Sequence, residues 1–134
     1  MKIDYDYIKK ICDVFLESET ECVNAFSSLN PEEEKFVSHI KIMAEKQLIS
    51  NVMGNSSFEG LGFSQDLSQG NVHYTYPKRL WRLTANGHDF ASALNKPDVL
   101  STLKEKFKDE GISSVMDIAK QLAQKYLEKK LESL

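Results

Sequence analysis

Apolar residues recur at three- and four-residue intervals close to the start of the chain, which is typical of one face of a helix. Asp4 stands just before them, and an aspartate there can accept a hydrogen bond from a free backbone N–H at the helix start. The pattern predicts a helix from about Asp4 to Ser18. Its apolar face is formed by Tyr7, Ile8, Ile11, Cys12 and Phe15.

A second helix is predicted after the polar connector "ETECVNAFSSLN". Asn30 can cap it, Pro31 suits its first position, and the glutamates that follow favour the positive end of a helix. Gln47 stands where such a helix commonly has a glycine, so we expect it to end without a left-handed residue. Its apolar face consists of Phe36, Val37, Ile40, Met43 and Ala44.

Two short runs favour β structure, "LISNVM" from Leu48 and "RLWRLT" from Arg79. We expect them to pair as a hairpin that covers the apolar side of the second helix. The stretch between them is rich in Gly, Ser, Asn and Gln, which indicates a long mobile loop. Within it, "VHYTY" alternates like a strand and is expected to extend the second run until Pro77 interrupts it.

Three helices are predicted in the remainder of the chain. The first is "HDFASALN" after Gly87, the second is opened by Pro97 and ended by Gly111, and the last has a capping-box pattern at Ser114. The last helix carries a wide apolar band, so we expect one edge to pack on its own domain and the other on a second copy of the chain. This band comprises Val115, Ile118, Ala119, Leu122, Ala123, Tyr126, Leu127 and Leu131.

The order of these elements predicts a mainly α fold with a small β-hairpin (α+β), as a winged-helix-like domain with a C-terminal helical extension. We assign residues 1–96 to the winged-helix-like core. Residues 97–134 form the extension, packed on the same domain, so that the protein has a single domain overall.

The composition, 41% hydrophobic and 28% charged over 134 residues, is that of a globular protein. No apolar run is long enough to span a bilayer, and the first residues do not resemble a secretory leader, so we expect a cytoplasmic protein without membrane association. Cys12 and Cys22 lack the spacing of a disulfide framework and are expected to be reduced.

The formal net charge is −3, and the imbalance lies in the predicted core. Residues 1–96 carry 10 Lys and Arg against 13 Asp and Glu, whereas residues 97–134 carry 7 of each kind. No overall positive field therefore attracts the protein to nucleic acid, although a local basic patch could still bind it.

Several stretches resemble, in order and across nearly the full length, the prokaryotic family catalogued as domain of unknown function 2513. They are "MKIDYDYIKKI", "HIKIMAEKQLI", "RLTANGHDFASAL" and "IAKQLAQKYLEKKL", with Asp4-x-Asp6 and the run from Leu83 to Phe90 as the most diagnostic motifs. The resemblance implies a small bacterial or prophage-borne protein of a family without an assigned activity. The sequence also resembles winged-helix regulators, but roughly a dozen residues between the first two helices leave little room for the positioning helix of a helix-turn-helix.

The first functional hypothesis is a DNA-associated accessory or regulatory factor that binds double-stranded DNA. Cationic side chains on the second helix and at the hairpin would contact phosphates, while His39 lies among them. Three glutamates at the start of the same helix oppose this, because each places a carboxylate near any phosphate that a lysine would contact. The candidate DNA-binding residues are Lys35, His39, Lys41, Lys46, Lys78, Arg79 and Arg82.

The second hypothesis is a protein–protein interaction adaptor that does not bind nucleic acid. Aromatic residues in and beside the hairpin form either a partner-binding surface or a small satellite core; they are Phe58, Phe63, Tyr74, Tyr76 and Trp81. The candidate interface consists of Trp81 at the hairpin and of Tyr126, Leu127 and Leu131 on the last helix, through which we also expect a homodimer.

Catalytic chemistry is not indicated. The sequence contains no zinc-protease motif, no phosphate-binding loop and no dinucleotide fingerprint, and its histidines and cysteines lack ligand spacing. His88 is interpreted as a residue at a helix start that hydrogen-bonds the hairpin. We therefore expect no enzyme activity, no cofactor, no metal and no small-molecule substrate.

Overall fold

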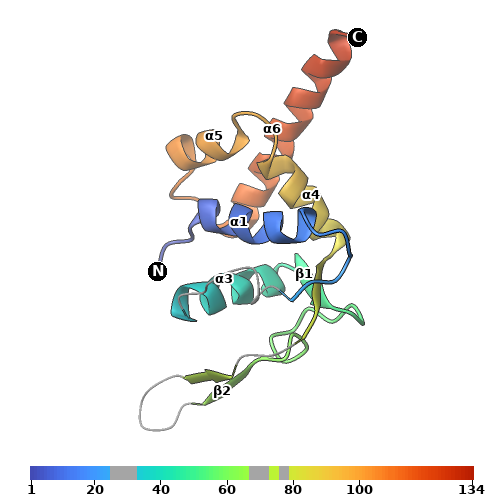
Figure 1. The fold of residues 1–134 in the computed structure, drawn as a ribbon. Helices are drawn as coiled ribbons and strands as arrows, with labels where there is room; N and C mark the ends of the chain where they lie inside the picture. Colours follow the sequence, from blue (N-terminus) through green and yellow to red (C-terminus); the bar gives the residue numbers. More distant parts are fainter. Residues whose placement is uncertain (25–32, 67–72, 76–78) are drawn as a thin grey trace.

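The computed structural model describes residues 1–24, 33–66, 73–75 and 79–134 (Figure 1). Its described part contains five helices and two two-stranded antiparallel sheets, so the mainly helical fold with a small β part is confirmed. The helices are α1 (Tyr5–Leu16), α3 (Glu33–Glu45), α4 (Ala85–Leu94), α5 (Val99–Lys106) and α6 (Ile112–Glu132), and the strands are β1 (Ile49–Asn51), β2 (Ser64–Asp66), β3 (His73–Thr75) and β4 (Trp81–Leu83).

Helix α1 forms as its apolar periodicity predicts, two residues shorter than expected at its end. The Asp4 side chain accepts a hydrogen bond from the Tyr7 amide at 3.1 Å, which satisfies one of the free N–H groups at the helix start. Ile8, Ile11 and Phe15 are buried on the inner face. Figure 1 shows α1 between α3 on one side and α4, α5 and α6 on the other.

Helix α3 ends at a left-handed residue, contrary to the prediction. Gln47 has a φ of 57°, and its amide donates to the Ala44 carbonyl at 2.9 Å while the Leu48 amide donates to the Met43 carbonyl at 2.8 Å. This pair of bonds is the Schellman ending usually made by glycine. The buried Leu48 that follows keeps the chain in this turn. The predicted cap at Asn30 and Pro31 lies outside the described residues.

The predicted hairpin over α3 is confirmed as the β1–β4 pair, in which Ile49 lies opposite Leu83 and Asn51 opposite Trp81. On the other side of β4, Val23 and Trp81 exchange backbone hydrogen bonds of 2.7 and 2.9 Å. Strand β4 therefore lies between β1 and the chain that follows α1. The sequence did not predict this second pairing.

The prediction of a mobile loop after β1 is wrong for residues 54–63, which fold into hydrogen-bonded turns with Leu61 and Phe63 in the core. Leu61 and Phe63 are buried, and the Leu61 carbonyl accepts a 2.8 Å hydrogen bond from Trp81 Nε1. Asn51 anchors the segment by accepting from the Asn55 amide and donating to the Gly60 carbonyl. This Gly- and Ser-rich stretch thus contributes two buried apolar side chains to the core, which its composition did not indicate.

Strands β2 and β3 form a separate sheet with Ser64 opposite Thr75, and this arm extends away from the helices (Figure 1). The alternating "VHYTY" run had been expected to prolong the strand before Pro77. Instead its central residues pair with β2 and not with β1. Residues 67–72 and 76–78 lie outside the described part of the chain.

Helix α4 begins before Gly87 rather than after it. Thr84 is the N-cap, and its hydroxyl accepts from the Gly87 amide at 3.0 Å. The same hydroxyl donates to the Gln47 carbonyl, so the cap also joins α4 to the end of α3. The sequence prediction failed because Ala-Asn-Gly was interpreted as a break, whereas it forms the first turn of the helix.

The boundaries predicted around α5 and α6 also need correction. Asp98 has a φ of 65°, a left-handed conformation that does not belong to an α-helix, so α5 starts at Val99 and not at Pro97. Gly111 does not end α5; it is the N-cap residue of α6. Because α6 already begins at Ile112, Ser114 lies inside its first turn and forms no capping box.

One cluster of buried side chains joins the elements on both sides of Lys96. It includes Ile8 of α1, Phe36 of α3, Phe90 of α4, Leu103 of α5 and Val115 of α6. Helix α6 packs on α4 and α5. The proposed boundary between core and extension stays a prediction. In the described residues no helix has the length and apolar character needed to cross a membrane.

Candidate functional site

Lys35, the first candidate DNA contact, is directed toward the start of α1. Its ammonium is 2.9 Å from the Asp4 carboxylate and 4.7 Å from the centre of the Tyr7 ring. Both carboxylate and ring attract the cation. Lys35 therefore links α3 to α1, and a phosphate would have to compete with Asp4 for it.

His39 is 1% exposed, so its predicted contact with DNA is wrong. Its Nδ1 lies 2.7 Å from the Lys35 carbonyl, and its Nε2 lies 2.9 Å from the Asp4 amide. Because a carbonyl can only accept, Nδ1 carries the proton and Nε2 accepts from Asp4. The ring also meets Tyr7 edge-on at 5.1 Å. The histidine thus holds the start of α1 against α3.

Lys41 and Lys46 are engaged at the other end of α3. The Lys41 ammonium is 5.1 Å from the centre of the Phe58 ring, and the Lys46 ammonium donates to the Ser113 hydroxyl at the start of α6. The outward stripe of α3, at three- and four-residue spacing, consists of Glu34, Ser38, Lys41 and Glu45. This stripe has two carboxylates and one ammonium, an unfavourable charge for a helix that should approach phosphates.

The basic residues predicted at the hairpin differ in their surroundings. Arg82 Nε lies 2.6 Å from a carboxylate oxygen of Glu21, and its Nη1 is 3.4 Å from the Ser50 hydroxyl. Arg79 is exposed. Lys78 lies outside the described residues. Of this group, Arg79 is the residue that the structure leaves best placed for an outside partner.

Trp81 is fully buried, so its assignment to a protein interface is wrong. Its ring lies 6.4 Å from Phe36 and 5.4 Å from Phe63, measured between centroids, and Phe63 stacks on Phe58 at 4.6 Å. These contacts support the satellite-core alternative for Phe58, Phe63 and Trp81. The side chains of Tyr74 and Tyr76 lie outside the description.

The candidate interface residues of α6 lie at its far end, which extends away from the other helices (Figure 1). Leu127 is 40% exposed and Leu131 is 66% exposed. Tyr126 is half-buried, with the Lys96 ammonium 6.0 Å from its ring centre. The two leucines therefore present apolar surface to solvent at one-turn spacing.

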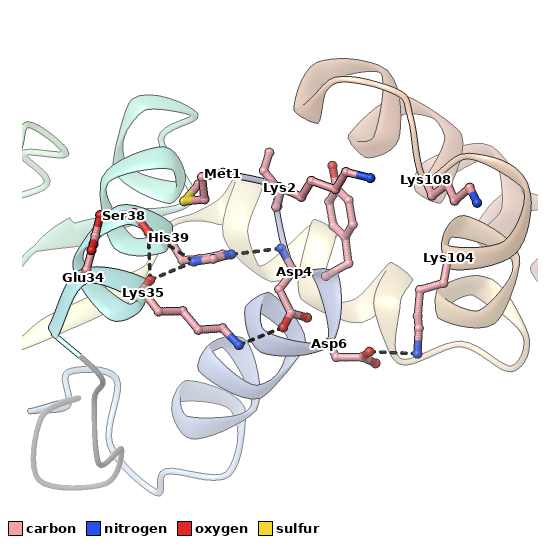
Figure 2. A pocket seen from close by; sticks show the side chains of 12 residues that line it. Met1, Lys2, Asp4, Asp6, Glu34, Lys35, Ser38, His39, Lys104 and Lys108 are labelled. Carbon is pink, nitrogen blue, oxygen red and sulfur yellow. Dashed lines mark hydrogen bonds and ion pairs between the residues drawn. The ribbon is translucent and has the colours of Figure 1, made fainter.

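A pocket of about 740 Å³ opens where the first six residues pass between α3 and α5 (Figure 2). Figure 2 shows Asp4 directed to Lys35 of α3 and Asp6 directed to Lys104 of α5, and the Asp6–Lys104 distance is 2.8 Å. The Asp4-x-Asp6 motif thus joins α1 to both neighbours. The sequence analysis had interpreted these residues only as a cap and a solvated first turn.

The pKa values of Asp4 and Cys12 are both shifted, and both shifts reflect structural roles of these side chains. Burial tends to raise the pKa of the Asp4 carboxyl, but hydrogen bonds from Lys35 and the Tyr7 amide, with the Lys35 charge, hold this pKa below its ordinary value. Burial raises the pKa of the Cys12 thiol to about 12, so this group is an inert core side chain at neutral pH. Among the described residues, no group of three His, Cys, Asp or Glu could hold a metal ion.

The pocket could not be predicted from the sequence. Its lysines come from three segments of the chain, with Lys2 at the start, Lys35 in α3, and Lys104 and Lys108 in or after α5. No spacing rule joins residues about one hundred positions apart. The only available signal was the pair of aspartates near the start, whose partners depend on the tertiary fold.

Comparisons with protein-family models, with curated proteins and with solved structures give no significant match. The resemblance to domain of unknown function 2513 therefore stays a prediction that rests on the motifs quoted above.

Proposed function

We propose that this protein is a non-catalytic protein-interaction adaptor on a winged-helix-like scaffold, which self-associates through the end of α6. The observation that carries the proposal is the exposure of Leu127 and Leu131 on a helix whose first half is buried by α4 and α5. Exposed leucines one turn apart are typical of a helix face that packs against another protein surface.

The order of the elements supports the winged-helix-like assignment. Helix α3 leads directly into β1, the connection to β4 forms the wing, and the chain after α1 pairs with β4 at Val23. In winged-helix domains a short strand between the first two helices likewise pairs with the second strand of the wing. The acidic outer stripe of α3 makes protein a better partner for this scaffold than DNA.

A second copy of the chain is the partner that the end of α6 fits best. Leu127 and Leu131 lie one turn apart on α6, with Glu128 on one side of this stripe and Lys130 on the other. In a parallel pair, the Lys130 edge of one helix faces the Glu128 edge of its partner. Because the stripe is short, we expect a weak dimer, with a Kd of about 10 μM to 1 mM.

The test is sedimentation velocity of the full chain from about 1 μM to about 1 mM, a range that brackets this affinity. The unchanged protein should shift from monomer to dimer, and the double variant Leu127→Glu, Leu131→Glu should stay monomeric. Lys129→Glu introduces the same acidic side chain on the opposite face and is the matched control. A monomer at every concentration, or equal effects of the double variant and the control, would reject the proposal.

A DNA-associated role is the second candidate, and exposed Arg79 beside the wing is the observation that favours it. Fluorescence anisotropy with a duplex at low and moderate salt distinguishes the two. We expect weak binding that salt abolishes, because Lys35 and Arg82 already face carboxylates. Tight binding that is lost on changing Lys78, Arg79 and Arg82 to alanine would instead establish the DNA-associated role.

A further inference from the structure

We propose that the pocket at the start of α1 binds a small organic anion that carries an apolar group. The pocket volume of about 740 Å³ lies in the range of small-molecule sites, about 300 to 1,000 Å³. The inference does not depend on self-association, since none of the pocket residues belongs to α6.

The pocket is preformed because hydrogen bonds and ion pairs join the first six residues, which form its base, to α3 and α5, which form its walls. The Asp4 amide donates to His39 of α3, and the Asp4 carboxylate pairs with Lys35 of the same helix. Asp6, two residues further along the chain, pairs with Lys104 of α5. A ligand would therefore enter a site whose walls need little reorganisation, which lowers the entropic cost of binding.

The charge of the lining favours an anion. Four lysines line the pocket against three carboxylates, and two of these carboxylates already face Lys35 and Lys104. Lys2 and Lys108 have no ion-pair partner among the described residues. The Lys104–Asp6 pair is part of the wall, so Lys2 and Lys108 are the cations that a ligand carboxylate would contact.

The apolar part of the ligand is inferred from the remaining side chains. Met1, 79% exposed, and half-buried Ile3 line the same pocket, and the aliphatic stems of Lys104 and Lys108 add further apolar surface. Covering this surface removes it from water, whereas a bare inorganic ion would leave it exposed. A carboxylate with a short alkyl chain has both required features.

The test is a chemical-shift titration of the ¹⁵N-labelled full chain with hexanoate, acetate and 1-hexanol. We expect hexanoate to saturate with a Kd of about 1 mM or below, moving amides at Lys2, Ser38 and Lys108. Acetate lacks the alkyl chain and 1-hexanol lacks the charge, so each should bind about tenfold more weakly or worse. Equal responses to hexanoate and 1-hexanol, shifts scattered outside the pocket, or no saturation would overturn the proposal.

Substitutions in and away from the pocket test whether hexanoate binds there. Changing Lys2 and Lys108 together to glutamine should weaken hexanoate binding about tenfold, since two charged contacts are lost. Changing Lys120 and Lys125 on α6 to glutamine removes the same charge away from the pocket and should have no effect. Ser38→Phe fills the pocket and should abolish binding. If the two double variants weaken hexanoate binding equally, the anion is attracted by the charge of the whole surface, and the pocket is rejected as its site.

Discussion

Hydrogen bonds join the end of α3 to the start of α4. They are formed by Gln47, Leu48, Thr84 and Gly87. The Thr84 hydroxyl bonds both the Gln47 carbonyl and the Gly87 amide, and the Thr84 amide donates to the Leu48 carbonyl at 3.0 Å. The backbones of the two segments come close together here, since a Cβ added at Gly87 would meet the Leu48 carbonyl. Two substitutions test this junction in opposite directions.

Gly87→Ala should destabilise the protein by about 2 to 3 kcal/mol, as expected for overpacking. A Cβ at this position would lie 2.0 Å from the Leu48 carbonyl oxygen, so backbone must move. Urea unfolding followed by circular dichroism measures the change. The neighbouring exposed residue supplies the control, because Asn86→Ala adds no atom against backbone. A Gly87→Ala variant as stable as the control would show that α3 and α4 approach less closely.

Gln47→Gly should stabilise the protein by about 0.5 to 1 kcal/mol, because glycine adopts a left-handed conformation without the steric cost of a Cβ. Gln47 is exposed and has a φ of 57°, so little packing is lost. The same urea experiment checks the sign. Glu45→Gly, still inside α3, should instead destabilise by about 1 kcal/mol. Loss of stability in both variants would argue against the Schellman ending.

Among the elements, α1 packs through its buried apolar face and is further linked to α3 by Asp4 and to α5 by Asp6. Asp4 caps the helix, supplies an amide to His39 and pairs with Lys35. One residue thus combines a local role that the sequence predicted with two long-range roles that it did not. The ionised state of Asp4 should therefore contribute to stability in a pH-dependent way.

Asp4→Asn should lower stability at pH 7 by up to about 1 kcal/mol, since asparagine keeps the cap and loses the ion pair. The folded pKa of Asp4 lies below its ordinary value of 3.8, so the carboxylate stabilises the fold above that pH. This contribution is lost as the pH falls through the folded pKa. Urea midpoints of both proteins should therefore converge as the pH falls below 3.8 and through the folded pKa. Glu128→Gln on the exposed end of α6 is the control, and an undiminished difference at low pH would contradict the assignment.

At the scale of the whole molecule, the helices after Lys96 complete the core. Val115 and Ala119 of α6 and Leu103 of α5 are buried in the same cluster as Phe90 and Leu94 of α4. By contrast, every residue from Leu127 onward is exposed. The two parts of the C-terminal region should therefore differ sharply in their contribution to folding.

A fragment of residues 1–96 should not fold cooperatively, because it exposes the apolar side of α4. Circular dichroism should show reduced helix content and no sigmoidal thermal transition. A chain ending at Tyr126 is the matched truncation and should unfold like the full protein, within about 0.5 kcal/mol. A cooperative transition in the 1–96 fragment would mean that the predicted core is an independent domain.

The sequence by itself determined the local elements. Apolar periodicity located α1 and the buried face of α3, because helix geometry directs every third or fourth residue to the same side. Runs of β-favourable residues located β1 and β4. Local signals were less reliable at the ends of elements. The roles of Gln47 and Gly87 depend on the segment that lies opposite each, and the neighbouring residues do not specify that segment.

Only the tertiary structure decided which polar and aromatic residues reach solvent. His39 lies inside because the Asp4 amide, 35 residues earlier, supplies a donor for its ring. Trp81 is buried because Leu61, in a stretch without periodicity, accepts its N–H and helps to cover it. The lysine-lined pocket arises because α3 and α5 meet at the first six residues. A side chain's environment depends on distant partners, and periodicity along the chain does not specify them.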